Sequence, residues 1–185
     1  TPIEEMRKVM DVNVMGLFAV TKACIPLIRK GKGRIINIGS SSSFLAFAGS
    51  SVYSASKFAV RAITDSLRLE MKLFDIPVVL VAPGAVESDI WEKSAEYKKK
   101  LRQAVDPGIS ELYKPFIKFG DELLEKIKPI PAAEVAEAVS HALSSAKPRL
   151  NYMVGKDARH AYRAARLPKR LVNWMIMKHV EKVTK

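Results

Sequence analysis

A tyrosine and a lysine stand four residues apart in a segment whose apolar spacing predicts a helix, and together they could carry out acid–base chemistry. They are Tyr53 and Lys57, in the run Tyr-Ser-Ala-Ser-Lys. Residues i and i+4 of a helix lie on the same face, one turn apart, so the two side chains can share a site. A free phenol titrates near ~10, but a nearby ammonium stabilises the phenolate. By itself this pattern is weak, since a surface tyrosine beside a solvated lysine has the same spacing.

A carbonyl or alcohol site also needs a hydroxyl that holds the substrate oxygen. Ser40 is the candidate, because it directly follows a predicted buried strand and precedes Tyr53 by 13 residues. Three further serines, at positions 41–43, compete with it, and a flexible polar loop is the simplest interpretation of the cluster. The spacing favours Ser40, and Ser42 is the second candidate for contact with the substrate.

The elements that must position these residues alternate between helix and strand. Thr1 is expected to cap a first helix that opens with Pro2 and acidic residues. Apolar periodicity predicts helices over 1–29 and 51–74 and from 131 through 142, and strands over 34–39, 76–81 and 151–154, the first two buried on both faces. This order is typical of parallel β/α units, whose ligands bind beyond the carboxyl ends of the strands. The loops 39–43 and 82–90 are expected at those ends.

Four short motifs strengthen the prediction. They are Asp-Val-Asn-Val-Met-Gly at 11–16, Arg-Ile-Ile-Asn-Ile-Gly-Ser at 34–40, the Tyr-Lys run at 53–57, and Pro-Gly-Ala-Val-Glu-Ser at 83–88. In this order and spacing they resemble the short-chain dehydrogenase/reductase family, and the resemblance covers nearly the whole chain. It implies an α/β fold with a Rossmann-like doubly wound parallel sheet. It also implies hydride transfer between NAD or NADP and an alcohol or carbonyl.

The resemblance assigns four catalytic roles, residue by residue. Tyr53 would be the general acid and base, and Ser40 would orient the substrate. Lys57 would contact the nicotinamide ribose and favour the tyrosinate. Asn13 would hold a water that links Lys57 to solvent, within a local distortion of its helix. A plainer interpretation of Asn13 is an amide bonded to a neighbouring carbonyl.

The same resemblance implies a cofactor site that shares Asn13, Tyr53 and Lys57 and adds the loop 83–88. Its cofactor-binding members would be Pro83, Gly84, Val86 and Ser88. Gly84 would let backbone approach the cofactor, Val86 would bond the carboxamide through its main chain, and Ser88 stands where the family often has threonine. Ser40, Ser42 and Trp91 would contact the substrate.

A glycine-rich phosphate loop, G-x-G-x-x-G or a related triplet, occurs nowhere in the 185 residues. The family carries that loop near its N-terminus. Residues 1–157 are therefore expected to be the C-terminal part of a catalytic domain whose N-terminal strands are missing, with a strand edge and an apolar surface left exposed. The competing hypothesis is a truncated, non-catalytic chain that serves as an interaction or membrane-surface module.

Residues 91–130 form a Lys- and Glu-rich segment with interspersed aromatics, predicted to be a helical lid over the substrate. Two interpretations fit this segment: its aromatics line an apolar pocket with a basic rim, or they simply pack the segment onto the domain. Later residues are similar to retinol, hydroxysteroid and hydroxybutyrate dehydrogenases, whereas 88–90 and 112–116 are similar to acyl-dihydroxyacetone-phosphate reductases. The substrate class, an apolar or lipid-like alcohol or ketone, stays open among these types.

Composition, 48% apolar and 27% charged, argues against a disordered, collagen-like or disulfide-scaffold chain. The net charge of +12 is concentrated late, with 11 basic and two acidic residues over 145–185. Three interpretations of the basic tail, 158–185, compete: a solvated helix docked on the domain, a membrane-surface helix around Trp174, and, least favoured, nucleic-acid binding.

The remaining expectations concern the surroundings of the chain. No uninterrupted run of about 18 apolar residues predicts a membrane span. The single cysteine, Cys24, excludes an intrachain disulfide and is expected to be packed, and the three histidines lack metal-ligand spacing, so no metal site is expected. A homo-oligomer through the helices 3–29 and 51–74 and a cytoplasmic or peripheral membrane location complete the predictions.

Overall fold

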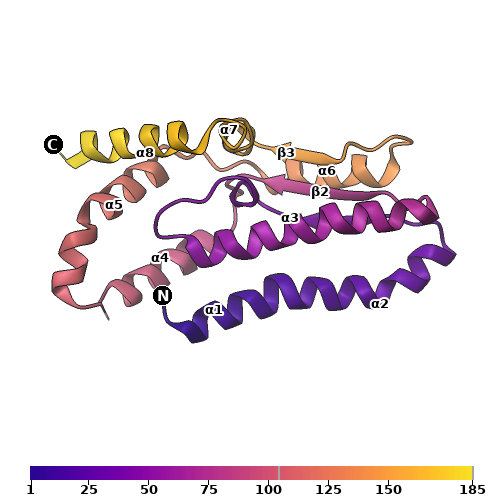
Figure 1. The fold of residues 1–185 in the computed structure, drawn as a ribbon, viewed down its shortest axis with the longest axis horizontal. Coiled ribbons are helices and arrows are strands. Elements are labelled where there is room, and N and C mark those ends of the chain that lie inside the picture. Colours follow the sequence, from indigo (N-terminus) through magenta and orange to yellow (C-terminus); the bar gives the residue numbers. More distant parts are fainter. Residues whose placement is uncertain (104, 185) are drawn as a thin grey trace.

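A three-stranded parallel sheet lies at the centre of the computed structural model, which describes residues 1–103 and 105–184 (Figure 1). Its strands are β1 (Ile35–Ile38), β2 (Val78–Pro83) and β3 (Asn151–Val154), in the order β1-β2-β3. Ile35 pairs with Val78, and Leu80 pairs with Asn151. All three predicted strands are thus confirmed, and the parallel pairing with intervening helices confirms the α/β class.

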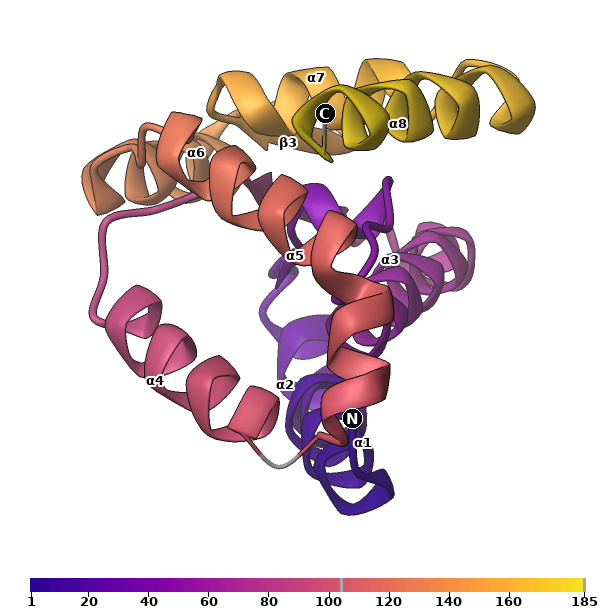
Figure 2. The same cartoon turned by 90° about the vertical axis from the view of Figure 1, so that its left-hand side faces the viewer.

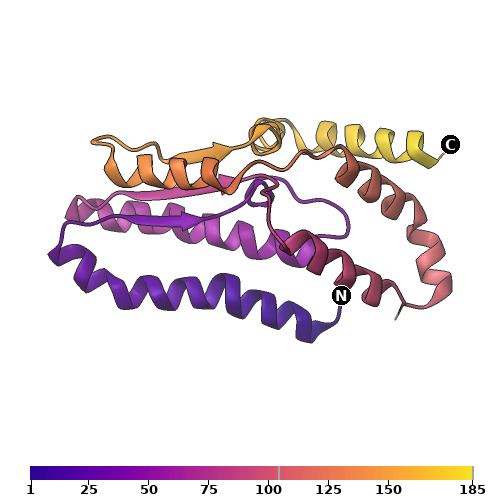
Figure 3. The ribbon, with the colours of Figure 1, turned by 180° about the vertical axis from the view of Figure 1, so that it is seen from behind.

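Helices cover both faces of the sheet (Figures 1 and 3). On one face, α3 (Ser51–Met71) packs on the strands, and the end of α2 (Leu17–Lys30) joins it. The other face is covered by α6 (Ala132–Ser144). β2 is the buried centre of the fold, because its Leu80 and Val81 are fully buried between the layers. Burial of such a strand on both faces requires the continuous apolar run that the sequence shows.

The first helix is continuous from Ile3 to Lys30 but is not uniform. α1 (Ile3–Met10) leads into a π-helical turn, Asp11–Gly16, and then into α2. Thr1 does not cap it: Pro2 occupies the N-cap position without a side-chain bond, so that expectation was wrong. A proline side chain offers no acceptor for the first N–H groups of α1, and Ile3 and Glu4 in that turn are exposed to water.

This helix also has the length and composition of a membrane span, with an 18-residue window of mean hydropathy 1.5. Polar residues interrupt the window, which is why a search for unbroken apolar runs does not find it. In the structure, however, the helix lies against α3, and Asn13 donates a hydrogen bond to Ser56 of α3. We therefore assign it to the protein fold.

One burial expectation was also wrong. The strand at 34–39 was expected to be buried on both faces, but β1 alternates, and Ile38 is 43% exposed. β1 is an edge strand in this sheet, and α6 packs mainly over β2 and β3. Among the described residues, β1 pairs with β2 alone.

Two further helical segments complete the fold (Figure 2). The predicted lid comprises α4 (Ile90–Gln103) and α5 (Pro107–Lys126), the latter capped by the Asp106 carboxylate. The basic tail, predicted from 158 on, falls on α8 (Lys169–Thr184) and on α7 (Lys156–Ala164), which begins two residues earlier and packs on β3; Pro168 lies between the two helices. α8 packs against α5, where Phe119 and His179 meet edge to face with ring centroids 5.4 Å apart. Lid and tail therefore form one contiguous surface.

Candidate active site

The first two turns of α3 place Tyr53 and Lys57 at the carboxyl end of β1. The Lys57 Nζ lies 5.8 Å from the centroid of the Tyr53 ring and donates a hydrogen bond of 3.2 Å to the carbonyl oxygen of Ile38. Lys57 is half-buried, and this burial lowers the pKa of its ammonium. The helical spacing thus brings the Lys57 ammonium and the Tyr53 ring to the same strand end.

Ser40 follows that strand end and is only 7% exposed. Its Oγ accepts the N–H of Ser42 at 3.2 Å, and its own N–H donates to the Oγ of Ser43 at 3.1 Å. A Cβ at Gly39 would lie 2.9 Å from both Leu80 and Ser43, so only glycine permits this tight exit from β1. The cluster is therefore an ordered capping turn and not a flexible loop, with Ser43 in a structural role.

Asn13 lies in the π-helical turn, in agreement with the expected distortion of its helix. Its Nδ2 donates to the Oγ of Ser56 at 3.1 Å, and that hydroxyl donates to the carbonyl of Tyr53 at 2.7 Å. The plainer interpretation, an amide bonded to a neighbouring carbonyl, does not hold for this donor. Asn13 is tied to the backbone of α3 at the turn that carries Tyr53 and Lys57. π-turns are frequent at functional sites because they reorient a side chain locally.

The loop 83–88 lies at the end of β2, on the same sheet edge as Ser40 because β1 and β2 are parallel. Two bonds of 2.9 Å pair it with Ile130: Ile130 N–H donates to the Ala85 carbonyl, and Glu87 N–H donates to the Ile130 carbonyl. These bonds flank Val86, so the N–H and C=O of Val86 itself point to the opposite side. Ser88 is exposed in the turn that follows.

Trp91 contacts this loop directly. Its indole Nε1 donates a hydrogen bond of 2.6 Å to the carbonyl oxygen of Val86. Trp91, which was expected to contact the substrate, thus binds the Val86 carbonyl, part of the main chain that was expected to face the cofactor. Gly84 has a second reason to be glycine: a Cβ there would overlap the carboxylate of Asp157.

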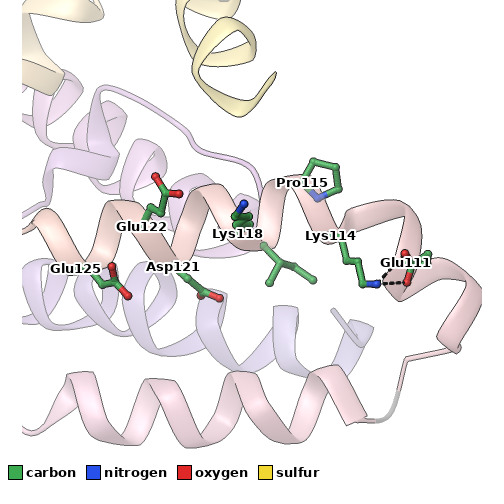
Figure 4. Close-up of a pocket in the computed structure, with 8 residues that line it drawn as sticks. Glu111, Lys114, Pro115, Lys118, Asp121, Glu122 and Glu125 are labelled. Carbon is green, nitrogen blue, oxygen red and sulfur yellow. Dashed lines mark hydrogen bonds and ion pairs between the residues drawn. The ribbon is translucent and has the colours of Figure 1, made fainter. Parts of the chain in front are cut away.

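A surface hollow lies elsewhere, along α5 (Figure 4). Its lining residues are Glu111, Lys114, Pro115, Ile117, Lys118, Asp121, Glu122 and Glu125. They include none of the residues predicted for catalysis or cofactor binding, and the Lys114–Glu111 ion pair crosses part of it. We assign no role in the reaction to this charged hollow.

Within 1–103 and 105–184, no group of three or more His, Cys, Asp or Glu side chains could hold a metal ion. His141 instead shares a 2.7 Å hydrogen bond with the hydroxyl of Tyr152. That hydroxyl also accepts the N–H of Arg149 at 3.2 Å, so we assign its proton to the bond with His141 Nδ1.

Three contributing residues, Ser56, Ile130 and Asp157, were not predicted from the sequence, and Ser43 was named only as a candidate competing with Ser40. Ser56 was inside the Tyr–Lys motif, and its position three residues after Tyr53, one helical turn on, was an available signal. Ser43 was visible as the fourth residue of a capping box that starts at Ser40. Ile130 and Asp157 come from distant segments, and no local pattern connects them to the loop 83–88.

Comparison with known proteins finds a matching family model and curated relatives. Residues 1–99 match the family model described as "short chain dehydrogenase". The chain is 36% identical over 165 residues to dehydrogenase/reductase SDR family member 9 of Bos taurus, covering 85% of this chain and 51% of the relative. It is 33% identical over 174 residues to retinol dehydrogenase 7 of Rattus norvegicus, covering 87% and 54% respectively. The chain thus spans about half the length of these curated relatives.

Solved structures share the fold. A short-chain dehydrogenase from Streptomyces avermitilis superposes with a TM-score of 0.71 at 26% identity, over 100% of this chain and 63% of that one. The closed form of a serine dehydrogenase complexed with NADP+ gives a TM-score of 0.58 at 25% identity, over 83% and 56% respectively. On the match to its family model, its relatives and its parallel α/β fold, the chain belongs to the short-chain dehydrogenase family.

Proposed function

We propose that the full-length protein is an NAD(P)-dependent oxidoreductase that transfers hydride between the cofactor and an apolar or lipid-like alcohol or ketone. The observation that carries the proposal is the Lys57 ammonium, which lies 5.8 Å from the centroid of the Tyr53 ring and donates a hydrogen bond to the carbonyl of Ile38, two residues before Ser40. The family match and a relative named retinol dehydrogenase support both the redox chemistry and a lipid-like substrate. Residues 1–157 would be the C-terminal part of the catalytic domain, with 91–130 as its lid.

Tyr53 would move the proton. In reduction, its hydroxyl donates a proton to the carbonyl oxygen of the substrate, and in oxidation the phenolate takes the alcohol proton back. The Lys57 ammonium stabilises that phenolate, and the Ser40 hydroxyl donates a hydrogen bond to the same substrate oxygen. Asn13 would hold a water through which the proton on Tyr53 exchanges with solvent.

The bound cofactor would supply or accept the hydride. Residues of this chain fit its nicotinamide half: Lys57 for the ribose, and the outward-pointing N–H of Val86 for the carboxamide. Pro83 and Ser88 flank that position in the same loop. The 185 residues contain no glycine triplet for the pyrophosphate, so the fit concerns the nicotinamide half alone.

Substitution of Tyr53 in the full-length protein tests this proposal. Tyr53→Phe keeps the ring but removes the proton, and kcat should fall about 10²- to 10⁴-fold, a much larger change than that in the cofactor Kd. Tyr162→Phe is the matched control, because the Tyr162 ring packs edge-on against Phe44. Near wild-type turnover of Tyr53→Phe would refute the assignment. A wild-type protein without turnover would favour the rival hypothesis of a non-catalytic module.

A second candidate function concerns the basic tail. Val172, Val180 and Val183 bury one face of α8, which supports docking on the domain. Its outer face nevertheless exposes Trp174, at 58%, and also Leu171, Met175 and Met177. Arg163, Arg166, Lys169 and Arg170 lie at or just before the start of this helix. We propose that this outer face contacts an anionic membrane surface, which implies a peripheral location.

Co-sedimentation of the full-length protein with phosphatidylserine-containing vesicles tests the contact. Binding should weaken with added salt and on Trp174→Ala, because both charge and the buried indole contribute. Leu143→Ala is the matched control, since Leu143 is similarly exposed, at 54%, but lies on α6. Salt-independent binding, or equal losses in both variants, would contradict the proposal. A fully soluble protein would fit a purely cytoplasmic location.

The oligomer expected through 3–29 and 51–74 is proposed on similar grounds. Val12, Val20, Leu27 and Leu69 are all exposed by 65% or more on these two helices. A second copy that covers them would remove a large apolar surface from water. Light scattering of the full-length protein should give a dimer or tetramer mass, and Leu27→Lys should lower it. A monomeric wild type would contradict the proposal.

A further inference from the structure

The segment that leads to Val86 is held by two bonds to residues late in the chain. Gly84 N–H donates to the carbonyl of Val154 in β3 at 2.9 Å. The next N–H, that of Ala85, donates at 2.6 Å to the Asp157 carboxylate. The first bond is an extension of sheet pairing. The second connects the loop to a side chain at the start of α7, and sheet geometry does not explain it.

The Asp157 carboxylate fits closely between the main chain of Gly84 and that of Gly155. Its other oxygen accepts the N–H of Ala158 at 2.9 Å, which satisfies one of the unpaired donors in the first turn of α7. A Cβ at Gly84 would overlap the carboxylate, and a Cβ at Gly155 would lie 2.7 Å from its Oδ1. Gly155 also has a φ of +93°, in the region that favours glycine. Two glycines thus make room for one half-buried aspartate.

The bond to Ala85 acts on the neighbouring peptide. A carboxylate accepting a backbone N–H forms a charge-assisted bond, which is stronger and more directional than a neutral one. The peptide between Ala85 and Val86 is also fixed by the Ile130 N–H on the Ala85 carbonyl, at 2.9 Å. With its N–H held by Asp157 and its C=O held by Ile130, Ala85 sets the direction in which the Val86 N–H points.

From this geometry we infer that Asp157 is a positioning residue for the nicotinamide-binding loop. It touches neither substrate nor cofactor; it orients the Val86 N–H by holding Ala85. The inference rests on the proposed function, because that function assigns the Val86 main chain to the carboxamide. α7 thereby connects the start of the basic tail to the cofactor side of the active site.

A double-mutant cycle in the full-length protein tests the inference. Asp157→Gly should raise the cofactor Kd about 10- to 100-fold, the range expected for a lost charged hydrogen bond. Asp157→Asn keeps an acceptor oxygen and should recover part of the affinity. Gly84→Ala alone forces the carboxylate away and should resemble Asp157→Gly. In the double variant, Gly84→Ala with Asp157→Gly, the added methyl occupies the space that the carboxylate leaves. The cofactor Kd of the double variant should therefore be no higher than that of Asp157→Gly alone.

Several outcomes decide the matter. Additive losses, or a cofactor Kd within twofold of wild type in Asp157→Gly, would overturn the inference. The control Asp65→Asn alters a carboxylate that pairs with Arg68 on α3, and it should leave the cofactor Kd unchanged. If wild type binds NAD(P) but Tyr53→Phe retains turnover, the proposed role of Tyr53 is wrong. The double-mutant cycle can still be measured in that case, because it depends only on the cofactor Kd. If wild type binds no NAD(P), both fail, and isothermal titration distinguishes this result directly.

Discussion

Ser56 offers the sharpest test of how the active site is held together. It is fully buried, and its hydroxyl joins the Asn13 amide to the Tyr53 carbonyl by bonds of 3.1 and 2.7 Å. Ser56→Ala removes both bonds without adding bulk. The Tyr53 carbonyl keeps its place in the α3 ladder, but the Asn13 Nδ2 loses its partner. Asn13 is half-buried, so water can replace that partner only incompletely.

The magnitude follows from these contacts. Two neutral hydrogen bonds contribute about 1 kcal/mol each, and alanine is more helix-favouring than serine by about 0.5 kcal/mol. The free energy of unfolding should therefore fall by about 1.5 kcal/mol. In a domain of about 150 to 250 residues that lowers Tm by about 3 to 6 °C, and the shift is smaller in the longer full-length protein. Loss of a fixed Asn13 orientation should reduce kcat by roughly 10- to 100-fold.

Thermal unfolding and steady-state kinetics of the full-length protein measure the two effects. Ser54→Ala is the matched control, because Ser54 is also buried and pairs with the Ser50 hydroxyl at 3.1 Å on the same helix. Both variants should lose similar stability, but only Ser56→Ala should lose turnover. Equal kcat values in the two variants would show that Asn13 does not act through Ser56.

Burial lowers the pKa of the Lys57 ammonium in the folded protein below its usual 10.5. As pH rises toward 10.5, the folded protein therefore loses the ammonium proton before the unfolded chain does. Because the unfolded chain binds more protons in this range, the contribution of Lys57 to stability rises with pH. The Tm difference between wild type and Lys57→Met should therefore shift in favour of wild type as pH rises toward 10.5, and a pH-independent difference would contradict this effect of burial. Trp91→Phe frees the Val86 carbonyl from the indole N–H, and the Kd for NAD(P) should fall about two- to twelvefold by fluorescence titration, the equivalent of one neutral hydrogen bond. A weaker-binding Trp91→Phe would show that the indole supports the cofactor site.

Sequence patterns predicted the layers well because the signals were local. Short apolar runs bounded by Gly and Pro mark the three strands, and β3 begins and ends where the pattern placed it. Helical spacing also predicted that Tyr53 and Lys57 share a face. The position of Asn13 in a distorted helix followed from the motif at 11–16, and the π-turn confirms it.

Contacts between distant segments were not predictable in the same way. Asp157 meets Ala85 only because β3 pairs with β2, which brings the start of α7 to the loop 83–88. The contact between Phe119 and His179 depends likewise on how α5 and α8 meet in space. Exposure of Ile38 reflects its place on an edge strand. Such contacts join residues that are far apart in the sequence, and no local periodic pattern marks them.

The π-turn between α1 and α2 has a consequence for alignment and engineering. A turn closed by i→i+5 bonds amounts to one residue more than a regular helix needs, so α1 and α2 are out of phase by about 100° relative to a single α-helix. A helical wheel drawn through both halves would therefore assign one of them to the wrong face. Homologues without the turn would align across it with a one-residue gap. Removing one residue from Asp11–Gly16 would straighten the helix and rotate the Asn13 amide away from Ser56.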